Sequence, residues 1–242
     1  MGFQFPKSIE EIELQEQLWQ ARARTDFWTY RRYMRPTMKV GWWQREIARK
    51  LQQFHDDLVA GKRPVDLIQA PPQHGKSWQL VDFIAWMAGQ NPDRRVIYSS
   101  FSERLGVRAN LMLQRIYDSE KHQAIFPETR ISERNAVTIS GQTLRNREIL
   151  EYRDHEGYFR NTTVRGAITG EGLDVAALDD PIKGREEANS PTVRAKTWDW
   201  LTDDMMTRMS DEAGILGIMT RWHIDDPFGR LIDEMGDRVR VH

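Results

Sequence analysis

The chain has 242 residues, of which 39% are hydrophobic, and this size suits one sizeable α/β domain. It has no cysteine, which excludes disulfides and thiolate metal sites and fits a reducing cytoplasm. No apolar run approaches the ~20 residues that span a bilayer, and residues 1–6 lack the layout of a signal peptide. The net charge of −1 excludes a globally basic DNA coat, so any nucleic-acid contact needs local basic patches or an assembled ring.

Helices and strands are predicted to alternate along the chain. Ser8 and Glu11 have capping-box spacing and predict a helix that runs to about Arg24. Further helices are expected over residues 42–59, 78–85, 103–117 and 191–208, and strands over residues 65–69, 95–99, 137–139, 162–165, 175–178 and 215–219. This alternation predicts an α/β fold with a parallel-rich central sheet that helices cover on both faces.

Residues 69–77 match the phosphate-binding pattern G-x-x-x-x-G-K-[ST], except that Ala70 replaces the first glycine. The segment lies between a predicted buried strand and a helix, where backbone N–H groups and the helix N-terminus attract phosphates. Lys76 would then neutralise phosphate oxygens, and the Ser77 hydroxyl would ligate Mg²⁺. The alternative is a tight turn with a stray lysine, since Gly-Lys-Ser is a common tripeptide.

Two acids, Asp179 and Asp180, end the predicted strand over residues 175–178. An aspartate at the carboxyl end of a strand can hold the Mg²⁺ that Ser77 also ligates, and we assign this role to Asp179. The adjacent Asp180 would act as general base on the water that attacks the γ-phosphate. Asp-Asp-Pro is also a good turn sequence, so an acidic turn that closes a strand is the alternative.

Three segments in chain order carry a family resemblance. Residues 71–77, residues 166–183 and the stretch Thr220-Arg221-Trp222-His223 resemble the motifs of large terminase subunits from tailed phages. The resemblance covers most of residues 40–235. It implies the ATPase motor domain of such a subunit, with the ASCE/RecA-like P-loop NTPase fold and with ATP and Mg²⁺ as cofactors. It also implies double-stranded DNA, a portal protein, a small terminase subunit and a self-assembled ring, expected to be a pentamer, as partners, and the cytoplasm of a bacterial host as location.

The resemblance also implies roles for individual residues. Gln44 lies where such motors have a glutamine that reads the adenine edge, whereas the neighbouring Trp42 and Trp43 are better explained as core or interface aromatics. The nucleotide contacts are expected from Gln44 and from Gln73, His74, Gly75, Lys76, Ser77 and Trp78. Thr220 corresponds to the coupling residue that senses the γ-phosphate. A structural role is favoured for His223 over a role as base or metal ligand.

The family implies an arginine finger, but Pro72, Gln73 and His74 stand where some members carry an arginine inside the P-loop. Arg104 and Arg108 lie on one face of the predicted helix over residues 103–117. We expect one of them to be supplied in trans by the next subunit of a ring. The alternative is a solvated basic helix face.

The expected organisation is an N-terminal helical extension or lid over residues 1–40 and a P-loop ATPase domain over residues 41–242. The nuclease domain that follows the motor in such subunits is expected to be absent, and with it nuclease activity. A helicase-like nucleic-acid-dependent ATPase and a non-catalytic P-loop scaffold are the alternative functions. A helicase core needs a second RecA-like lobe, for which 242 residues leave no room, and Ala70 motivates the scaffold.

Overall fold

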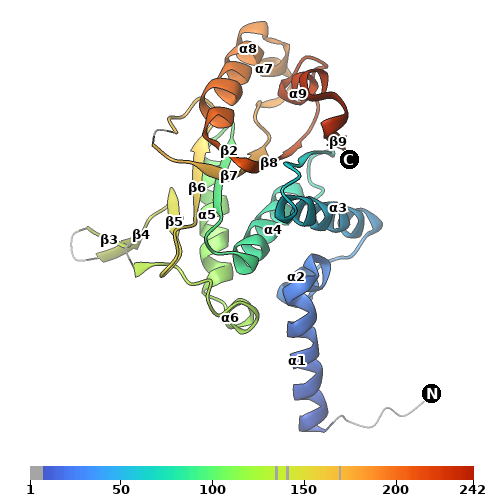
Figure 1. The fold of residues 1–242 in the computed structure, drawn as a ribbon, viewed down its shortest axis with the longest axis vertical. Coiled ribbons are helices and arrows are strands. Elements are labelled where there is room, and N and C mark those ends of the chain that lie inside the picture. The colour runs from blue at the N-terminus through green and yellow to red at the C-terminus, as the bar shows by residue number, and fades with distance from the viewer. Residues whose placement is uncertain (1–7, 134–135, 140–141, 169) are drawn as a thin grey trace.

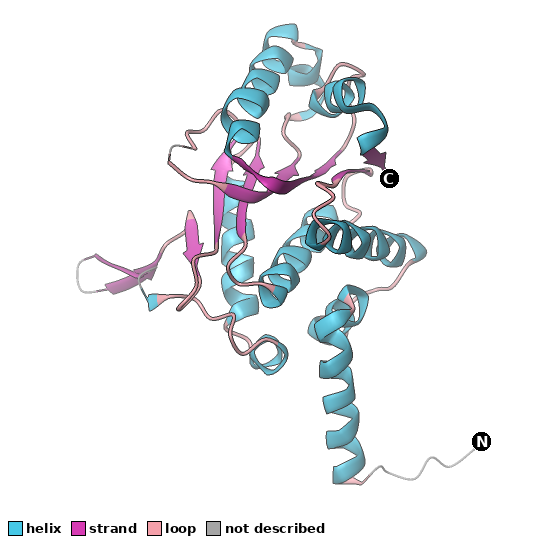
Figure 2. Ribbon diagram, in the orientation of Figure 1, coloured by secondary structure: helices cyan, strands magenta, loops and turns pink. Residues whose placement is uncertain are grey.

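The computed structural model describes residues 8–133, 136–139, 142–168 and 170–242. Its central sheet contains β1 (Val65–Gln69), β2 (Arg95–Ser100), β5 (Ile149–Glu151), β6 (Tyr158–Thr163), β7 (Leu173–Asp179), β8 (Met209–Met219) and β9 (Val239–Val241). Within the described residues these strands form one sheet in the order β5-β6-β2-β7-β8-β1-β9, with helices on both sides (Figure 1, Figure 2). Only β5 runs antiparallel to its neighbour among these pairs. The predicted α/β fold with a parallel-rich central sheet that helices cover on both faces is confirmed.

The position of β8 determines where the predicted motifs meet. This strand is inserted between β1, which precedes the predicted phosphate-binding segment, and β7, at whose end the two aspartates lie. All three strands are parallel, so their carboxyl ends lie at one edge of the sheet. In an open parallel sheet this edge is where ligands bind.

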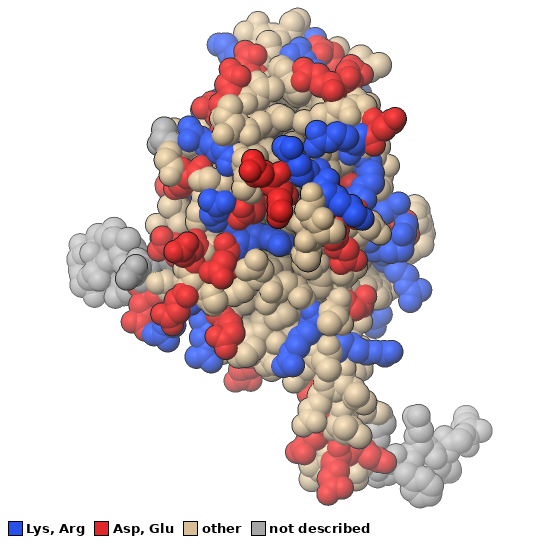
Figure 3. All heavy atoms as spheres, in the orientation of Figure 1, with Lys and Arg blue, Asp and Glu red and all other residues tan. Residues whose placement is uncertain are grey.

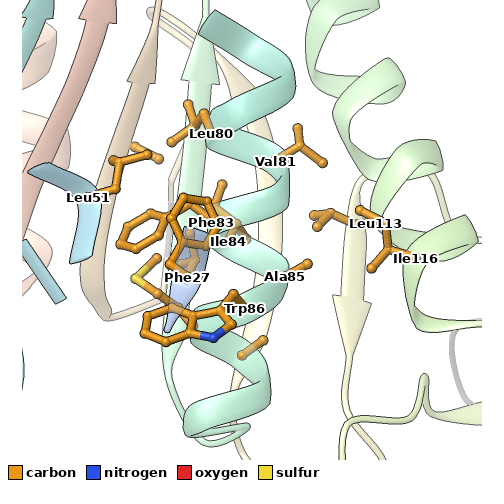
Figure 4. Close-up of a cluster of buried hydrophobic side chains, with 14 of the residues drawn as sticks. Phe27, Leu51, Leu80, Val81, Phe83, Ile84, Ala85, Trp86, Leu113 and Ile116 are labelled. Carbon is orange, nitrogen blue, oxygen red and sulfur yellow. The ribbon is translucent and has the colours of Figure 1, made fainter. Parts of the chain in front are cut away.

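The two faces of the sheet have separate cores because successive side chains of a strand point to opposite sides. Val175 and Ala177 of β7 belong to one core, and Ala176 and Leu178 belong to the other. The first core is covered by α2 (Phe27–Met34), α3 (Trp42–Val59), α4 (Lys76–Gln90), α5 (Glu103–Tyr117) and α6 (Glu120–Ile125), and Figure 4 shows its centre on α4. The second is covered by the π-helical segment Trp200–Met205 and by α9 (Pro227–Met235).

The remaining elements lie outside these layers. The helix α1 (Ile9–Thr25) projects from the body of the molecule, and the strands β3 (Ala136–Ile139) and β4 (Gln142–Arg145) form a separate antiparallel pair (Figure 1). The short helices α7 (Gly184–Asn189) and α8 (Pro191–Asp199) follow β7. None of the helices in the described ranges is long and apolar enough to cross a membrane.

Several predicted elements have the observed bounds, and others do not. The helices over residues 42–59 and 103–117 and the strand over residues 65–69 agree with α3, α5 and β1. The helix expected over residues 191–208 changes from α-helical to π-helical at Trp200 and then to a 3₁₀ turn. The strand expected over residues 162–165 begins earlier, at Tyr158, and ends at Thr163, because the chain turns at Val164. The helix α2 was not predicted, and the domain boundary at residue 40 stays a prediction.

Trp86 joins the N-terminal helices to the first core. Its side chain is fully buried, and its indole Nε1 donates a hydrogen bond to the carbonyl of Ala23 over 3.0 Å. We expect Trp86→Ala to lower the free energy of unfolding by about 3–5 kcal/mol, because it leaves a large cavity. Trp86→Phe is the matched control, and it keeps most of the volume and should cost less. Urea unfolding curves measure both, and equal losses would show that the hydrogen bond rather than packing dominates.

Candidate functional site

A cavity of about 240 Å³ lies at the carboxyl edge of the sheet, between the segment that joins β1 to α4 and α5. Its lining residues are Pro72, Gln73, Gly75, Lys76, Ser77, Trp78, Val81, Tyr98, Leu105, Arg108, Ala109, Met112, Asp179 and Asp180. The fold therefore brings together both acids at the end of β7, the lysine and serine at the start of α4, and one arginine of α5. Arg104 is outside this set.

The segment over residues 69–77, predicted to bind phosphate, turns sharply to enter α4. Gln73 and Gly75 have φ angles of 66° and 74°, in the left-handed region, and Gly75 is the N-cap of α4. At Gly75 this backbone conformation, rather than a lack of space, favours glycine, since a Cβ there would meet nothing within 4 Å. The first turn of α4 begins at Lys76, so its unpaired N–H groups and the helix dipole favour an anion at the cavity.

The Lys76 side chain is 6% exposed and lies between two strands. Its Nζ donates to the carbonyl of Ala70 at 2.5 Å and to Oγ1 of Thr220 at 2.7 Å. Burial lowers the pKa of Lys76, and the charges of Asp180 and Asp179 partly oppose this effect. Two of the three N–H groups of Nζ thus donate to neutral oxygens, and the positive charge is available to an anion in the cavity.

Asp179 is completely buried at the end of β7. Its Oδ2 accepts a hydrogen bond from the Tyr98 hydroxyl at 2.6 Å, whereas its Oδ1 has no hydrogen-bond partner in the described part of the chain. Burial raises the pKa of Asp179 to about 6, and the hydrogen bond from Tyr98 together with the nearby Ser77 hydroxyl moderates the rise. An unpaired buried carboxylate oxygen beside a serine hydroxyl fits a hard cation such as Mg²⁺, which prefers oxygen ligands.

The described residues contain no group of three or more histidine, aspartate or glutamate side chains placed to hold a metal. Mg²⁺ at phosphate sites is held by one or two protein oxygens, with phosphate and water completing its coordination. The pair of Ser77 and Asp179 matches that pattern.

Asp180 is held by the strand next to its own. Its φ is 46°, a left-handed conformation that is uncommon for a residue other than glycine. Its Oδ1 accepts a hydrogen bond from the backbone N–H of Thr220 at 2.9 Å, and its own N–H donates to Ile218. The side chain is less buried than that of Asp179 and lines the cavity. Thr220 therefore contacts both Lys76 and Asp180.

Arg108 of α5 lies beside Trp78, the residue that follows Ser77. The Trp78 ring has the Arg35 guanidinium 4.5 Å from its centroid and the Arg108 guanidinium 6.0 Å from it, and both are cation–π contacts. Arg35 also forms an ion pair with Asp82 at 2.6 Å. The tryptophan thus connects the N-terminal helices to the cation that lines the cavity.

Gln44 lies outside the first cavity. A neighbouring cavity of about 430 Å³ is lined by Gln44 together with His74, Gly75, Trp78 and the segment from Arg35 to Lys39. The amide Oε1 of Gln44 accepts from the N–H of Gly41 at 3.0 Å and so caps α3. Its role in reading adenine stays a prediction.

The two tryptophans before Gln44 have different surroundings. Trp43 contacts the His74 ring edge-on, with centroids 6.0 Å apart, whereas Trp42 is 80% exposed. His74 thus lies between Trp43 and the second cavity.

His223 stabilises the loop that follows β8. Its Nδ1 accepts a hydrogen bond from the N–H of Asp225 at 3.0 Å, and it does not line the first cavity. Asp225 forms ion pairs with Arg194 of α8 and Arg230 of α9, at 3.0 and 2.7 Å.

Sequence reasoning missed Tyr98, Arg35 and Asp225. Only Tyr98 had a signal in the sequence, because alternation along its predicted strand places it on the same face as other residues of the first core.

Comparison with known proteins found one matching family model and a similar solved structure. The family model described as terminase large subunit, T4likevirus-type, N-terminal, matches residues 67–233. The chain is similar in structure to the large terminase of bacteriophage HK97, with a TM-score of 0.51 and 11% sequence identity, over 85% of this chain. It spans 39% of that terminase chain. No curated protein matches in sequence.

The raised pKa of Asp179 predicts how stability depends on pH. A carboxyl whose pKa rises on folding, from 3.8 to about 6, adds stability below pH 4 that is lost as the pH rises through 6. Between pH 5 and pH 8 the parental protein should therefore lose about 1 kcal/mol that Asp179→Asn does not lose. Thermal unfolding of both proteins without nucleotide at the two pH values measures this. A gap that does not change with pH would contradict the assignment of a buried, titrating carboxylate.

Proposed function

Since the chain belongs to the terminase large subunit family through its N-terminal, T4likevirus-type region, we propose that it is the ATP-hydrolysing motor domain of a viral DNA-packaging terminase. In this proposal ATP hydrolysis is coupled to the translocation of double-stranded DNA into a procapsid. One observation carries it: Lys76, Ser77, Asp179 and Asp180 line one cavity at the N-terminus of α4. This is the set of groups that phosphoryl transfer from a nucleotide needs.

The phosphates of ATP would lie against the first turn of α4 and the Lys76 ammonium. That ammonium is already fixed by Ala70 and Thr220 and needs little rearrangement when a phosphate binds. Ser77 and Asp179 would hold Mg²⁺, which supplies charge neutralisation of the phosphate oxygens when bound.

Asp180 would accept a proton from the water that attacks the γ-phosphorus. As the new P–O bond forms, the bond to the β,γ-bridging oxygen breaks and ADP leaves. The hydrogen bond from the Thr220 N–H holds the Asp180 carboxylate in place. Because Thr220 also contacts Lys76, loss of the γ-phosphate would change the contacts of Thr220 at the end of β8. This supports a coupling role for Thr220.

Arg108 would stabilise the charge of the transferring phosphoryl group. It lines the cavity of its own chain, stacked near Trp78, so it can act in cis as well as on a neighbouring subunit. The supply of a finger in trans, by Arg104 or Arg108, stays a prediction, as do the partners: DNA, a ring of subunits, a portal protein and a small terminase subunit.

Two other functions were considered. A non-catalytic P-loop scaffold is suggested by Ala70, but Ala70 is 6% exposed and contributes its carbonyl to Lys76, which a glycine would do equally. A helicase-like ATPase would share the cavity, so DNA translocation without strand separation is what distinguishes the proposed motor from it.

Substitution of the two central groups tests hydrolysis. We expect Lys76→Ala to lower kcat/KM for Mg-ATP by at least ~10²-fold, because phosphate neutralisation is lost. Asp180→Asn should still bind ATP and lower kcat by ~10²–10⁴-fold, because the base is lost. Phosphate release measures turnover, and a fluorescent ATP analogue measures binding. Lys62→Ala, at an exposed lysine that does not line the cavity, is the control. Parental turnover by Asp180→Asn would rule out this base.

Mixing two inactive variants separates the cis and trans arrangements of Arg108. We expect Arg108→Ala to reduce kcat by ~10³-fold or more, with a smaller change in nucleotide affinity. If Arg108 acts in cis, a mixture of Arg108→Ala and Lys76→Ala chains stays inactive, since no chain has both groups. Recovery of turnover in the mixture, at concentrations where the chains associate, would show supply in trans.

A further inference from the structure

Asp179 is held in a different way from the acids at the surface of the molecule. Figure 3 shows Asp and Glu atoms at the surface, several of them beside Lys and Arg atoms. Asp179 is completely buried, and it forms no ion pair with any described residue. The donor to its Oδ2 is instead the neutral hydroxyl of Tyr98, at 2.6 Å. This contact fixes one oxygen of the carboxylate without cancelling its charge.

The order of the strands places Tyr98 beside Asp179. The strands β2 and β7 are parallel neighbours, with Ser100 opposite Asp179 and Tyr98 opposite Ala177. Because alternate residues of a strand point to the same face, Tyr98 and Asp179 lie on the face of the first core. The Tyr98 ring packs against Phe159 of β6, with ring centroids 5.9 Å apart. Packing on both strands thus fixes where the hydroxyl points.

The Tyr98 hydroxyl acts as the donor in this contact. Burial raises the pKa of Tyr98 well above its ordinary value, and the charge of Asp179 adds to the rise, so the hydroxyl keeps its proton. A carboxyl group rotates readily about its last side-chain bond, and a hydrogen bond to Oδ2 removes this freedom. Oδ1, which has no hydrogen-bond partner within the described ranges, is then left for another ligand.

The two adjacent acids are fixed by different neighbours of β7. Asp180 accepts from the backbone N–H of Thr220, which follows β8, whereas Asp179 accepts from a side chain of β2. A backbone donor is present whatever residue stands at position 220. The orientation of Asp179, by contrast, depends on the identity of the residue at position 98.

We propose that Tyr98 is a positioning residue for the divalent cation of the site. Its hydroxyl holds Asp179 so that the free carboxylate oxygen is available to a Mg²⁺ that Ser77 also ligates. Carboxylates that bind metals are themselves hydrogen-bonded, and loss of such a partner costs about 10–100-fold in metal affinity. The inference rests on the proposed function, because it needs a nucleotide site that takes Mg²⁺. Tyr98 acts only through Asp179.

Binding of a fluorescent ADP analogue tests this role without any hydrolysis. Its dissociation constant is measured in EDTA and at saturating Mg²⁺, and the first value divided by the second gives the contribution of the metal. We expect the parental chain to bind more tightly with Mg²⁺. Tyr98→Phe should reduce the ratio by about tenfold or more, because Asp179 is then no longer held. Affinity in EDTA should not fall.

A double-mutant cycle shows whether Tyr98 acts through Asp179. Asp179→Asn should itself remove most of the metal contribution, and in that background Tyr98→Phe should have no further effect on the ratio. Tyr117→Phe is the matched control, because this buried tyrosine loses a contact between its hydroxyl and that of Tyr152, at 2.9 Å, and does not line the cavity. A merely structural role of Tyr98 would lower the melting temperature of both tyrosine variants and leave both ratios at the parental value.

The possible failures can be told apart. A Tyr98→Phe chain with the parental ratio would overturn the inference and leave the proposed function standing. So would a parental chain that binds the ADP analogue equally well in EDTA and in Mg²⁺. A further loss of the metal contribution on adding Tyr98→Phe to Asp179→Asn would show that Tyr98 acts by another route, and would overturn the inference too. A parental chain that binds the analogue in neither condition would contradict the proposed function and the inference together.

Discussion

The buried Lys76 ammonium is the group on which the arrangement of the site depends. Among the described residues it forms no direct ion pair, and its hydrogen bonds go to a carbonyl at the end of β1 and to a hydroxyl at the end of β8. Thr220 in turn holds Asp180 at the end of β7. Lys76 and Thr220 together thus connect the ends of β1, β8 and β7. This connection requires β8 to lie between β1 and β7. A different strand order would separate the lysine from both aspartates.

The free protein holds its site at a cost in stability. A charge at Asp179 is unfavourable because the carboxyl is completely buried, Asp180 has a left-handed backbone, and Lys76 is desolvated. Each of these would be relieved by a ligand that brings phosphate oxygens and a divalent cation. Binding energy would therefore be used to stabilise groups that are already in position, which is how a preorganised site gains in rate.

The sequence predicted the local parts of the site well. An apolar run before Pro71, a glycine at position 75 and an apolar run before Asp179 are local signals, and they placed β1, β7 and the turn into α4 correctly. The contacts between these parts could not be predicted, since they depend on which strands are neighbours. The stacking of Arg108 near Trp78 joins α5 to α4, and no spacing in the sequence encodes it.

Gln44 shows a second limit of sequence reasoning. Its side chain caps α3 through Gly41, a local hydrogen bond that competes with any contact to a ligand. The strand expected over residues 162–165 was placed too late, because the pattern of residues alone does not show that the chain turns at Val164. The bounds agreed for α3, α5 and β1, whereas the apolar run over residues 215–219 belongs to a strand that begins earlier, at Met209.

The insertion of β8 between β1 and β7 has a consequence for how the chain folds. The strands β1 and β7 belong to the same sheet but cannot pair with each other. The part of the sheet that contains β1 and the part that contains β7 therefore stay separate until β8, residues 209–219, is available. During synthesis, a nascent chain that has not yet exposed this segment has two unfinished, apolar sheet edges. Such a chain needs long-range pairing late in synthesis, which makes folding slow and exposes it to aggregation. A pause or a truncation that withholds β8, which ends at Met219, should therefore be far more damaging to yield in cells than one beyond this strand.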